Sequence, residues 1–140
     1  MSGAVVLAWD PNGTVDGAPF PVAAALDDVA EFRALRPYSR GDFYPLTEYS
    51  TSDEAWAAFQ WNRPEEGDGI VLAFRRNLAA ESALSLALHG LDPAAEYEVR
   101  YEDYGLSLIK SGRELLAGLD VKIPEPAASL LVKYRRKDRP

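Results

Sequence analysis

The stretch from Trp56 to Arg75, which reads WAAFQWNRPEEGDGIVLAFR, decides the fold that the sequence predicts. Two sets of side chains alternate along each half of it: first Ala57, Phe59 and Trp61 with Trp56, Ala58 and Gln60, and then Ile70, Leu72 and Phe74 with Val71, Ala73 and Arg75. The connection Arg63–Gly69 is rich in residues that favour turns. Strict alternation is typical of half-buried strands, so this stretch predicts a β-hairpin.

The same alternation continues toward the C-terminus. It recurs in Leu84, Leu86 and Leu88, in Tyr97, Val99 and Tyr101, in Leu106 and Leu108, in Val121 and Ile123, and in Leu130, Val132 and Tyr134. Strands of a parallel sheet would instead be continuous apolar runs. We therefore expect an all-β fold, an antiparallel β-sandwich of about eight strands with Greek-key character. Only Ser111–Gly118 breaks the pattern, and there we expect a turn with at most one helical turn.

The first 40 residues have a different pattern. Apolar side chains recur at steps of three and four residues, at Val22, Leu26, Val29, Phe32 and Leu35. This spacing predicts one helix at about 22–36, with Pro21 just before it and Pro37 ending it. The expected organisation is an N-terminal arm over residues 1–40 and a β-sandwich over residues 41–137. A lone helix with an apolar stripe must pack on something, either the sandwich or a partner.

A local signal supports the sandwich. Tyr97 begins a strand directly after the turn Gly90–Pro93. This arrangement is typical of a tyrosine corner, in which the phenol hydroxyl bonds the backbone a few residues upstream. The corner is a feature of architecture and implies no function.

Composition excludes several classes of function. The chain has 140 residues, no cysteine, one histidine and a formal net charge of −7. Without cysteine, disulfide scaffolds, Cys-ligated zinc and thiol catalysis are excluded, and we expect no metal and no cofactor. An acidic chain repels nucleic acid, and its one basic patch, Lys133–Arg139, is interpreted as a solvated strand end. No apolar run spans a membrane and no signal segment is seen, so the expected location is the cytoplasm.

No catalytic residue is predicted. His89 is interpreted as an outward-facing residue at a turn, because no Ser or Asp motif pairs with it. Glu65, Glu66 and Asp68 cluster on a hairpin tip, where solvent keeps a carboxyl from acquiring the raised pKa of a general acid. Asp27–Asp28 is interpreted as charge in the early turns of the helix.

The aromatic residues are the most suggestive group, because exposed rings can stack on sugars. Phe59 and Trp61 are expected to face the core, with Trp56 on the opposite face of the same strand and Trp9 outside the sandwich. Packing is favoured over sugar contact, and the ligand-binding residues stay unknown.

From Arg40 onward the chain resembles the C-terminal β-sandwich domain of glycoside hydrolase family 36, the α-galactosidase type. The resemblance is carried, in order, by Gly41-Asp42-Phe43-Tyr44-Pro45-Leu46-Thr47, Trp56-Ala57-Ala58-Phe59-Gln60, Gly69-Ile70-Val71-Leu72-Ala73-Phe74-Arg75, Leu88-His89-Gly90-Leu91-Asp92-Pro93 with Tyr97 and Val99, Ser111-Gly112-Arg113-Glu114-Leu115 with Gly118-Leu119, and Leu130-Leu131-Val132-Lys133-Tyr134-Arg135. The helix would then be similar to the last helix of the catalytic barrel. The first residues, up to about 20, resemble nothing in the family.

The resemblance implies a parent enzyme that hydrolyses terminal galactosides with two aspartates in a (β/α) barrel. None of that barrel's motifs is present, so no catalytic residue is carried over. The expected function is a non-catalytic accessory domain that packs against this barrel through Val22, Leu26, Val29 and Phe32. Two alternatives stay open: a carbohydrate-binding module that takes galactosides on Trp56 or tyrosines, and a fibronectin-like interaction module that uses a sheet edge or end loops.

Overall fold

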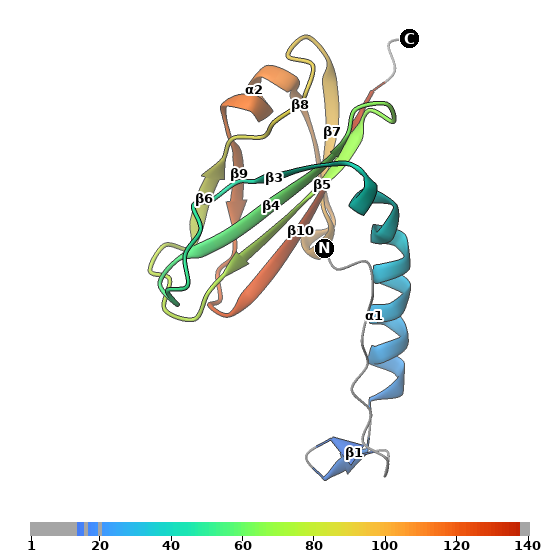
Figure 1. The fold of residues 1–140 in the computed structure, drawn as a ribbon, viewed down its shortest axis with the longest axis vertical. Helices are drawn as coiled ribbons and strands as arrows, with labels where there is room; N and C mark the ends of the chain where they lie inside the picture. The colour runs from blue at the N-terminus through green and yellow to red at the C-terminus, as the bar shows by residue number, and fades with distance from the viewer. Residues whose placement is uncertain (1–13, 16, 20, 138–140) are drawn as a thin grey trace. The chain divides into compact units, whose positions relative to one another are not determined.

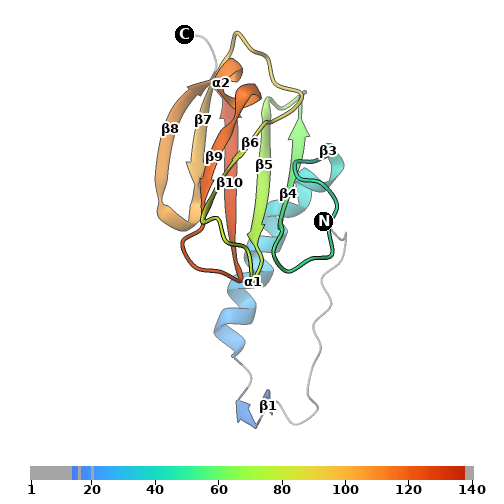
Figure 2. The ribbon, with the colours of Figure 1, turned by 90° about the vertical axis from the view of Figure 1, so that its left-hand side faces the viewer.

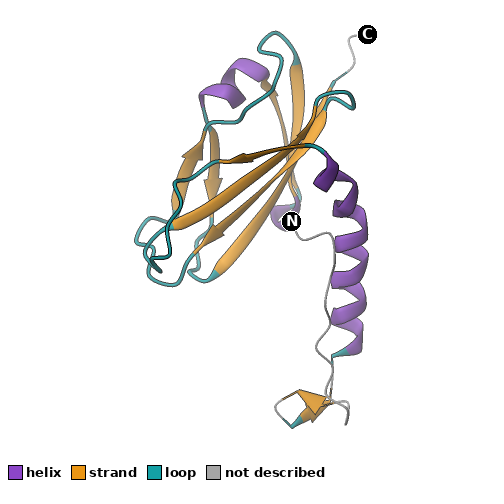
Figure 3. Ribbon diagram, viewed as in Figure 1, coloured by secondary structure: helices purple, strands orange, loops and turns teal. Residues whose placement is uncertain are grey.

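The computed structural model describes residues 14–15, 17–19 and 21–137. The chain divides into two compact units, Met1–Arg40 and Gly41–Pro140. Figure 1 shows the order of the elements along the chain, and Figure 3 shows how strands dominate the second unit. Among the described residues, no helix is both long enough and apolar enough to cross a bilayer.

The first unit contains a small hairpin and a helix. The hairpin pairs β1 (Thr14–Val15) with β2 (Ala18–Pro19), which the sequence pattern did not predict. The helix α1 (Val22–Leu35) continues into the 3₁₀ helix η1 (Arg36–Arg40), and this confirms the predicted helix at about 22–36. Of its apolar stripe, Leu35 is buried while Val22 and Leu26 are exposed.

The second unit contains, among its described residues, eight strands, two short helical segments and the connecting turns. Its elements are β3 (Asp42–Pro45), β4 (Trp56–Arg63), β5 (Asp68–Arg75), β6 (Ala83–Leu86), β7 (Glu96–Tyr101), η2 (Glu102–Tyr104), β8 (Leu106–Ser111), α2 (Gly112–Ala117), β9 (Leu119–Lys122) and β10 (Ala128–Arg136).

These strands form two antiparallel sheets. Six strands make one sheet in the order β3-β4-β5-β10-β7-β8, and β6 pairs with β9 in the other. In Figure 2, β6 and β9 lie in front of the central strands of the larger sheet, with β8 and β3 at its two edges. The chain leaves the larger sheet after β8, passes through β9 and returns with β10 beside β7. The predicted all-β sandwich with one preceding helix is confirmed, and this return gives it Greek-key character.

The core lies between the two sheets. Inward-facing side chains alternate with outward-facing ones along each strand, as the period of two requires. The fully buried members include Val71, Val99, Leu119, Leu130 and Val132. These residues come from β5, β7, β9 and β10, so the core joins both layers.

Helix α2 is longer than the single turn expected for Ser111–Gly118. It begins with a capping box: the Ser111 hydroxyl accepts the Glu114 N–H, and the Glu114 carboxylate accepts the Ser111 N–H at 2.8 Å. The Ser111 hydroxyl also donates to the Glu114 carboxylate at 2.7 Å, and this bond, together with the one from the Ser111 N–H, lowers the pKa of the exposed Glu114 carboxyl. Leu115 is fully buried in the core, so packing and capping together stabilise the helix.

Candidate functional site

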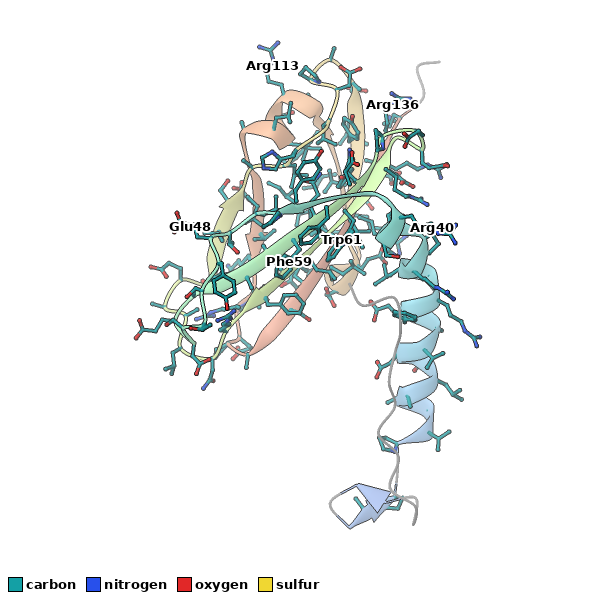
Figure 4. The ribbon with its side chains drawn as sticks, viewed as in Figure 1. Arg40, Glu48, Phe59, Trp61, Arg113 and Arg136 are labelled. Carbon is teal, nitrogen blue, oxygen red and sulfur yellow. The ribbon has the colours of Figure 1, made fainter. Side chains whose placement is uncertain are left out.

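The two faces of strand β4 carry different side chains from those that the hydrophobic pattern predicted. Trp56 and Ala58 belong to the core between the sheets, and their face also carries Gln60 and Asn62, which are buried. Phe59 and Trp61, labelled in Figure 4, lie on the opposite, outer face of the six-stranded sheet. The expectation that Phe59 and Trp61 face the core was therefore wrong.

The polar residues of this strand form a buried network with β10 and the chain segment after β6. We define the Gln60–Tyr134 network as Gln60, Asn62, Tyr134 and the backbone of His89 and Gly90. Gln60 Nε2 donates to the Tyr134 hydroxyl at 2.7 Å, and that hydroxyl donates to Asn62 Oδ1 at 2.8 Å. Asn62 Nδ2 donates to the Gly90 carbonyl at 3.1 Å. The network therefore joins two strands of the larger sheet, β4 and β10, to the connection between β6 and β7.

A glycine makes this network sterically possible. Gly69 lies on β5 between its two paired neighbours, Asn62 on β4 and Tyr134 on β10. A Cβ at Gly69 would collide with the Tyr134 hydroxyl. Because position 69 has no side chain, the Tyr134 ring can lie across β5 and reach Gln60 and Asn62.

The network is fully satisfied. Burial raises the pKa of the Tyr134 phenol, so this group stays neutral and donates a hydrogen bond. Within the described part of the chain, no buried side-chain nitrogen or oxygen lacks a hydrogen-bond partner. No polar atom of the network is left over for a ligand, so its chemistry is that of a structural anchor.

The network positions His89 at the surface. Gln60 binds the His89 backbone on both its N–H and its C=O, while the residue itself is exposed. The imidazole stacks on Tyr44 of β3, with ring centroids 5.0 Å apart and planes inclined by 20°. The exposure of His89 agrees with its interpretation as an outward-facing residue at a turn.

The acidic residues considered from the sequence do not form a catalytic pair. Glu65 and Glu66 are exposed on the hairpin tip, as expected. Asp68 is buried rather than solvated, and its carboxylate accepts two bonds from Arg63, at 2.8 and 2.7 Å. Asp27–Asp28 is exposed on α1, beyond the first turn. No group of three or more potential metal ligands occurs among the described residues.

Three rings gather on the outer face of the larger sheet. We define the outer-face cluster as Phe43 of β3 with Phe59 and Trp61 of β4. The Phe43 centroid lies 5.9 Å from that of Phe59 and 5.2 Å from that of Trp61. Phe43 is 51% exposed, whereas Trp61 is 5% exposed. Phe43 lies in the segment Gly41–Thr47. The alternation of side chains within β4 gave no indication that this ring packs beside Phe59 and Trp61.

The other aromatic candidates are distributed differently. Trp56 is buried in the core, and its indole N–H donates to the Glu81 carbonyl at 3.1 Å. It therefore offers no face to a sugar. Tyr49 and Tyr104 are exposed but lie in separate segments, before β4 and before β8. Trp9 lies outside the described residues.

The tyrosine corner predicted at Tyr97 is present. The Asp92 N–H donates to the Tyr97 hydroxyl at 3.0 Å, five positions upstream. Tyr97 is buried, and the N–H of Gly112, the first residue of α2, donates to the Ala95 carbonyl of this turn. This corner fixes the approach of the chain to β7.

Comparisons with known sequences give no relative. No protein-family model matches the chain, and no curated protein is similar enough in sequence to be identified as related.

Comparison with solved structures finds the fold in α-galactosidases. The chain is similar to the galactosidase domain of the alpha-galactosidase-sucrose kinase AgaSK, with a TM-score of 0.61 and 19% identity. It is also similar to the GH36 alpha-galactosidase AgaA from Geobacillus stearothermophilus, a variant solved in complex with 1-deoxygalactonojirimycin, with a TM-score of 0.62 and 21% identity. Each match covers 91% of this chain but only 17% of the solved one.

The extent of these matches is informative. A region covering 91% of the chain is longer than the unit Gly41–Pro140, so it also takes in part of the unit Met1–Arg40. The chain thus has the fold of one segment of the galactosidase domains of GH36 α-galactosidases.

Proposed function

We propose that this chain is a non-catalytic accessory β-sandwich domain of an α-galactosidase-type glycoside hydrolase and packs against its catalytic barrel. The observation that carries the proposal is the fold similarity to two α-galactosidases over 91% of the chain, through both the arm and the sandwich. Because the chain corresponds to 17% of each solved chain, most of such an enzyme would lie outside it.

The chemistry of the described residues supports a non-catalytic role. A retaining or inverting glycosidase needs two carboxyl groups facing each other across a cleft. Here Asp68 is neutralised by Arg63, and Glu65 and Glu66 are exposed on a turn. His89 stacks on Tyr44 and is supported by a network without free polar atoms. The buried polar groups are used to hold the sandwich together.

The helix offers the surface for the proposed barrel contact. Val22 is 54% exposed and Leu26 is 64% exposed, one turn apart on α1. Val29 and Phe32 continue the same stripe and are half-buried. Interfaces between domains of one chain bury about 600–1,500 Å², and an apolar stripe of this kind supplies part of that area. A cytoplasmic location, consistent with the absence of cysteine, is part of the same proposal.

The carbohydrate-binding alternative is less well supported. Its named stacking residue, Trp56, lies in the core, and Trp61 is also buried. Galactosides would then have to bind through Phe43 or through tyrosines that lie apart, such as Tyr49 and Tyr104. We therefore favour the accessory role.

Antibodies against the purified chain test the proposal. They are used to precipitate the native protein from extracts of the source organism, and hydrolysis of p-nitrophenyl α-galactoside is then assayed in the precipitate. We expect α-galactosidase activity in the precipitate and a native polypeptide several times longer than this chain. A short native polypeptide that precipitates without this activity would overturn the proposal. Antibodies from before immunisation serve as the control.

A further inference from the structure

The outer face of the six-stranded sheet is apolar over the strands β3, β4 and β5. The core contains alternate residues of β4 and β5, such as Ala58 and Val71, so the residues between them face outward. Those outward-facing residues are cross-strand partners of one another, and Phe43 of β3 is paired with Trp61. We define the apolar half of this face as Phe43, Ala57, Phe59, Trp61, Ile70, Leu72 and Phe74. It contains the outer-face cluster and extends it onto β5.

Toward β7 the same face becomes charged. Strand β7 directs Glu96, Glu98 and Arg100 outward, because the residues that alternate with them belong to the core. Lys133 of β10 is paired with Arg100, and the two cations lie 3.4 and 3.3 Å from Glu102 Oε1. Antiparallel sheets commonly have one apolar face and one solvated face. The β7 side of the outer face fits that description, whereas the apolar half does not.

The chain leaves the apolar half partly exposed. Phe43 is 51% exposed and Phe74 39%, while Phe59 and Leu72 are half-buried. The core between the two sheets lies on the opposite face, so it gives no reason for these side chains to be apolar. A sheet with apolar residues on both faces is typical of a sheet packed between two layers. We therefore expect a second body on the outer side of β3, β4 and β5.

We propose that the apolar half is the surface on which the catalytic barrel of the parent enzyme docks. This inference rests on the proposed function, in which the barrel precedes the sandwich and most of the enzyme lies outside this chain. The chain enters the sheet at β3, and Gly41 alone separates β3 from η1. The polypeptide before residue 41 is therefore led to the β3 edge, and consecutive elements are usually adjacent in space. The apolar half begins at that edge, whereas β7 lies on the far side of β10.

Gly41 keeps this connection short and close to the sheet. A Cβ at position 41 would collide with the Asn62 carbonyl of β4, so the backbone passes directly against that strand. A long spacer would allow the barrel to dock anywhere on the sandwich, but η1 ends at Arg40 and β3 begins at Asp42. The connection therefore favours the part of the enzyme that precedes residue 41 over a separate molecule, which no feature of this face selects.

Cysteine labelling measures coverage of the apolar half directly, because the chain has no cysteine of its own. Phe43→Cys and the control Ser107→Cys, at an exposed residue of β8, are made both in the purified 140-residue chain and in the chromosomal gene of the source organism. We expect iodoacetamide to modify position 43 about tenfold more slowly in the native enzyme than in the chain, because the interface must open first. Position 107 should react equally fast in both, as peptide mass spectrometry can show. Equal rates at position 43 would overturn the inference.

Heat inactivation provides the second readout. Phe74→Glu places a carboxylate in the proposed interface, where it would lose its hydration, whereas Ser107→Glu places one in solvent. We expect Phe74→Glu to shorten the half-life of α-galactosidase activity in heated extracts several-fold relative to Ser107→Glu, while the two isolated chains melt at similar temperatures. A half-life that falls only in step with the melting temperature of the isolated chain would contradict the inference.

The two proposals can fail separately. A native protein that carries no α-galactosidase activity would overturn the proposed function and this inference together. A native α-galactosidase that contains this chain, but in which position 43 is labelled as fast as in the isolated chain, would overturn the docking surface alone.

Discussion

The side chain of Gln60 holds the backbone of His89 as a neighbouring strand would. Gln60 Nε2 donates to the His89 carbonyl at 2.9 Å, and the His89 N–H donates to Gln60 Oε1 at 2.8 Å. These residues are 29 positions apart, with Gln60 on β4 and His89 in the connection between β6 and β7. One amide group therefore fixes the loop that follows β6 against the larger sheet.

We predict that Gln60→Ala destabilises the fold. It removes one of the two hydrogen bonds of the Tyr134 hydroxyl and the Gln60 bonds to the His89 N–H and C=O, and each buried group left unsatisfied costs about 1–3 kcal/mol. Urea unfolding measures the free energy of unfolding. Asn77→Ala, at an exposed residue of a turn, should change it by less than about 0.5 kcal/mol. Equal effects of the two substitutions would show that the network is not an anchor.

Alkaline pH is expected to destabilise the protein through Tyr134. Burial raises the pKa of this phenol in the folded state above its ordinary value of 10.0. Above pH 10 the unfolded chain therefore loses a proton that the folded chain keeps, and ionisation favours the unfolded state. The free energy of unfolding should be unaffected by Tyr134 below pH 10 and fall above it, by at most about 1.4 kcal/mol per pH unit for this group.

The variant Tyr134→Phe distinguishes the effect of phenol ionisation on stability from the effect of the hydrogen bonds that the hydroxyl makes. It should lower stability at neutral pH but make the decline above pH 10 less steep. Tyr49→Phe, at a residue 93% exposed, should leave both the stability and its pH dependence unchanged. Ultraviolet absorbance of phenolate follows the titration. A Tyr134→Phe variant with the same alkaline slope as the unmodified chain would rule out this assignment.

Replacement of Arg75 by lysine is expected to destabilise the fold. Its guanidinium donates to the carbonyls of Ala79, Ile123 and Pro124, with Nη2 at 3.0 Å from the Ala79 oxygen and Nη1 at 3.0 Å from that of Ile123. It thus joins the segment after β5 to the segment after β9. A lysine ammonium cannot match this planar set of donors, and hydrogen bonds to charged groups contribute about 1.5–3 kcal/mol each.

The neighbouring arginine provides a matched control for that substitution. Arg76 Nη1 donates to the Ser52 carbonyl at 2.8 Å, a single contact that a lysine can replace. We expect Arg75→Lys to lower the melting temperature clearly and Arg76→Lys to lower it little. A larger effect of Arg76→Lys would contradict the proposed role of Arg75.

The tyrosine corner should also contribute measurably to stability. Tyr97→Phe removes the acceptor of the Asp92 N–H, with an expected cost of about 1–3 kcal/mol. Tyr104→Phe removes a bond from an exposed hydroxyl to the Lys122 carbonyl, which water can replace at little cost. Differential scanning calorimetry of both variants distinguishes the buried bond from the exposed one. Indistinguishable melting temperatures would argue against the corner as a structural lock.

The sequence pattern predicted the strands, α1 and the corner at Tyr97 because these depend on local periodicity and turn residues. It could not tell which face of β4 points inward, since Phe59 and Trp61 are at least as apolar as Trp56 and Ala58. Burial of Gln60 and Asn62 depends on Tyr134, which lies more than 70 positions away, and on the missing side chain of Gly69. The local alternation of apolar and polar residues gives no information about contacts between residues that are so far apart in the chain.

Sequence alternation was also misleading about strand β8, where it predicted burial of side chains that are exposed. Alternation of Leu106 and Leu108 predicted a half-buried strand, yet both residues are exposed. Their exposure follows from the topology, because β8 is an edge strand and the second layer consists of β6 and β9 only. The capping box at Ser111 and Glu114, by contrast, has a local sequence signal that would have predicted α2.

The central claim is that this chain serves as an accessory domain of an α-galactosidase, and deletion of its coding segment tests that claim most directly. The segment for Gly41–Pro140 is removed in frame from the chromosome of the source organism, and the half-life of α-galactosidase activity in heated extracts is measured. The account predicts that the activity is lost or becomes much less heat-stable. Unchanged activity with an unchanged half-life would contradict it.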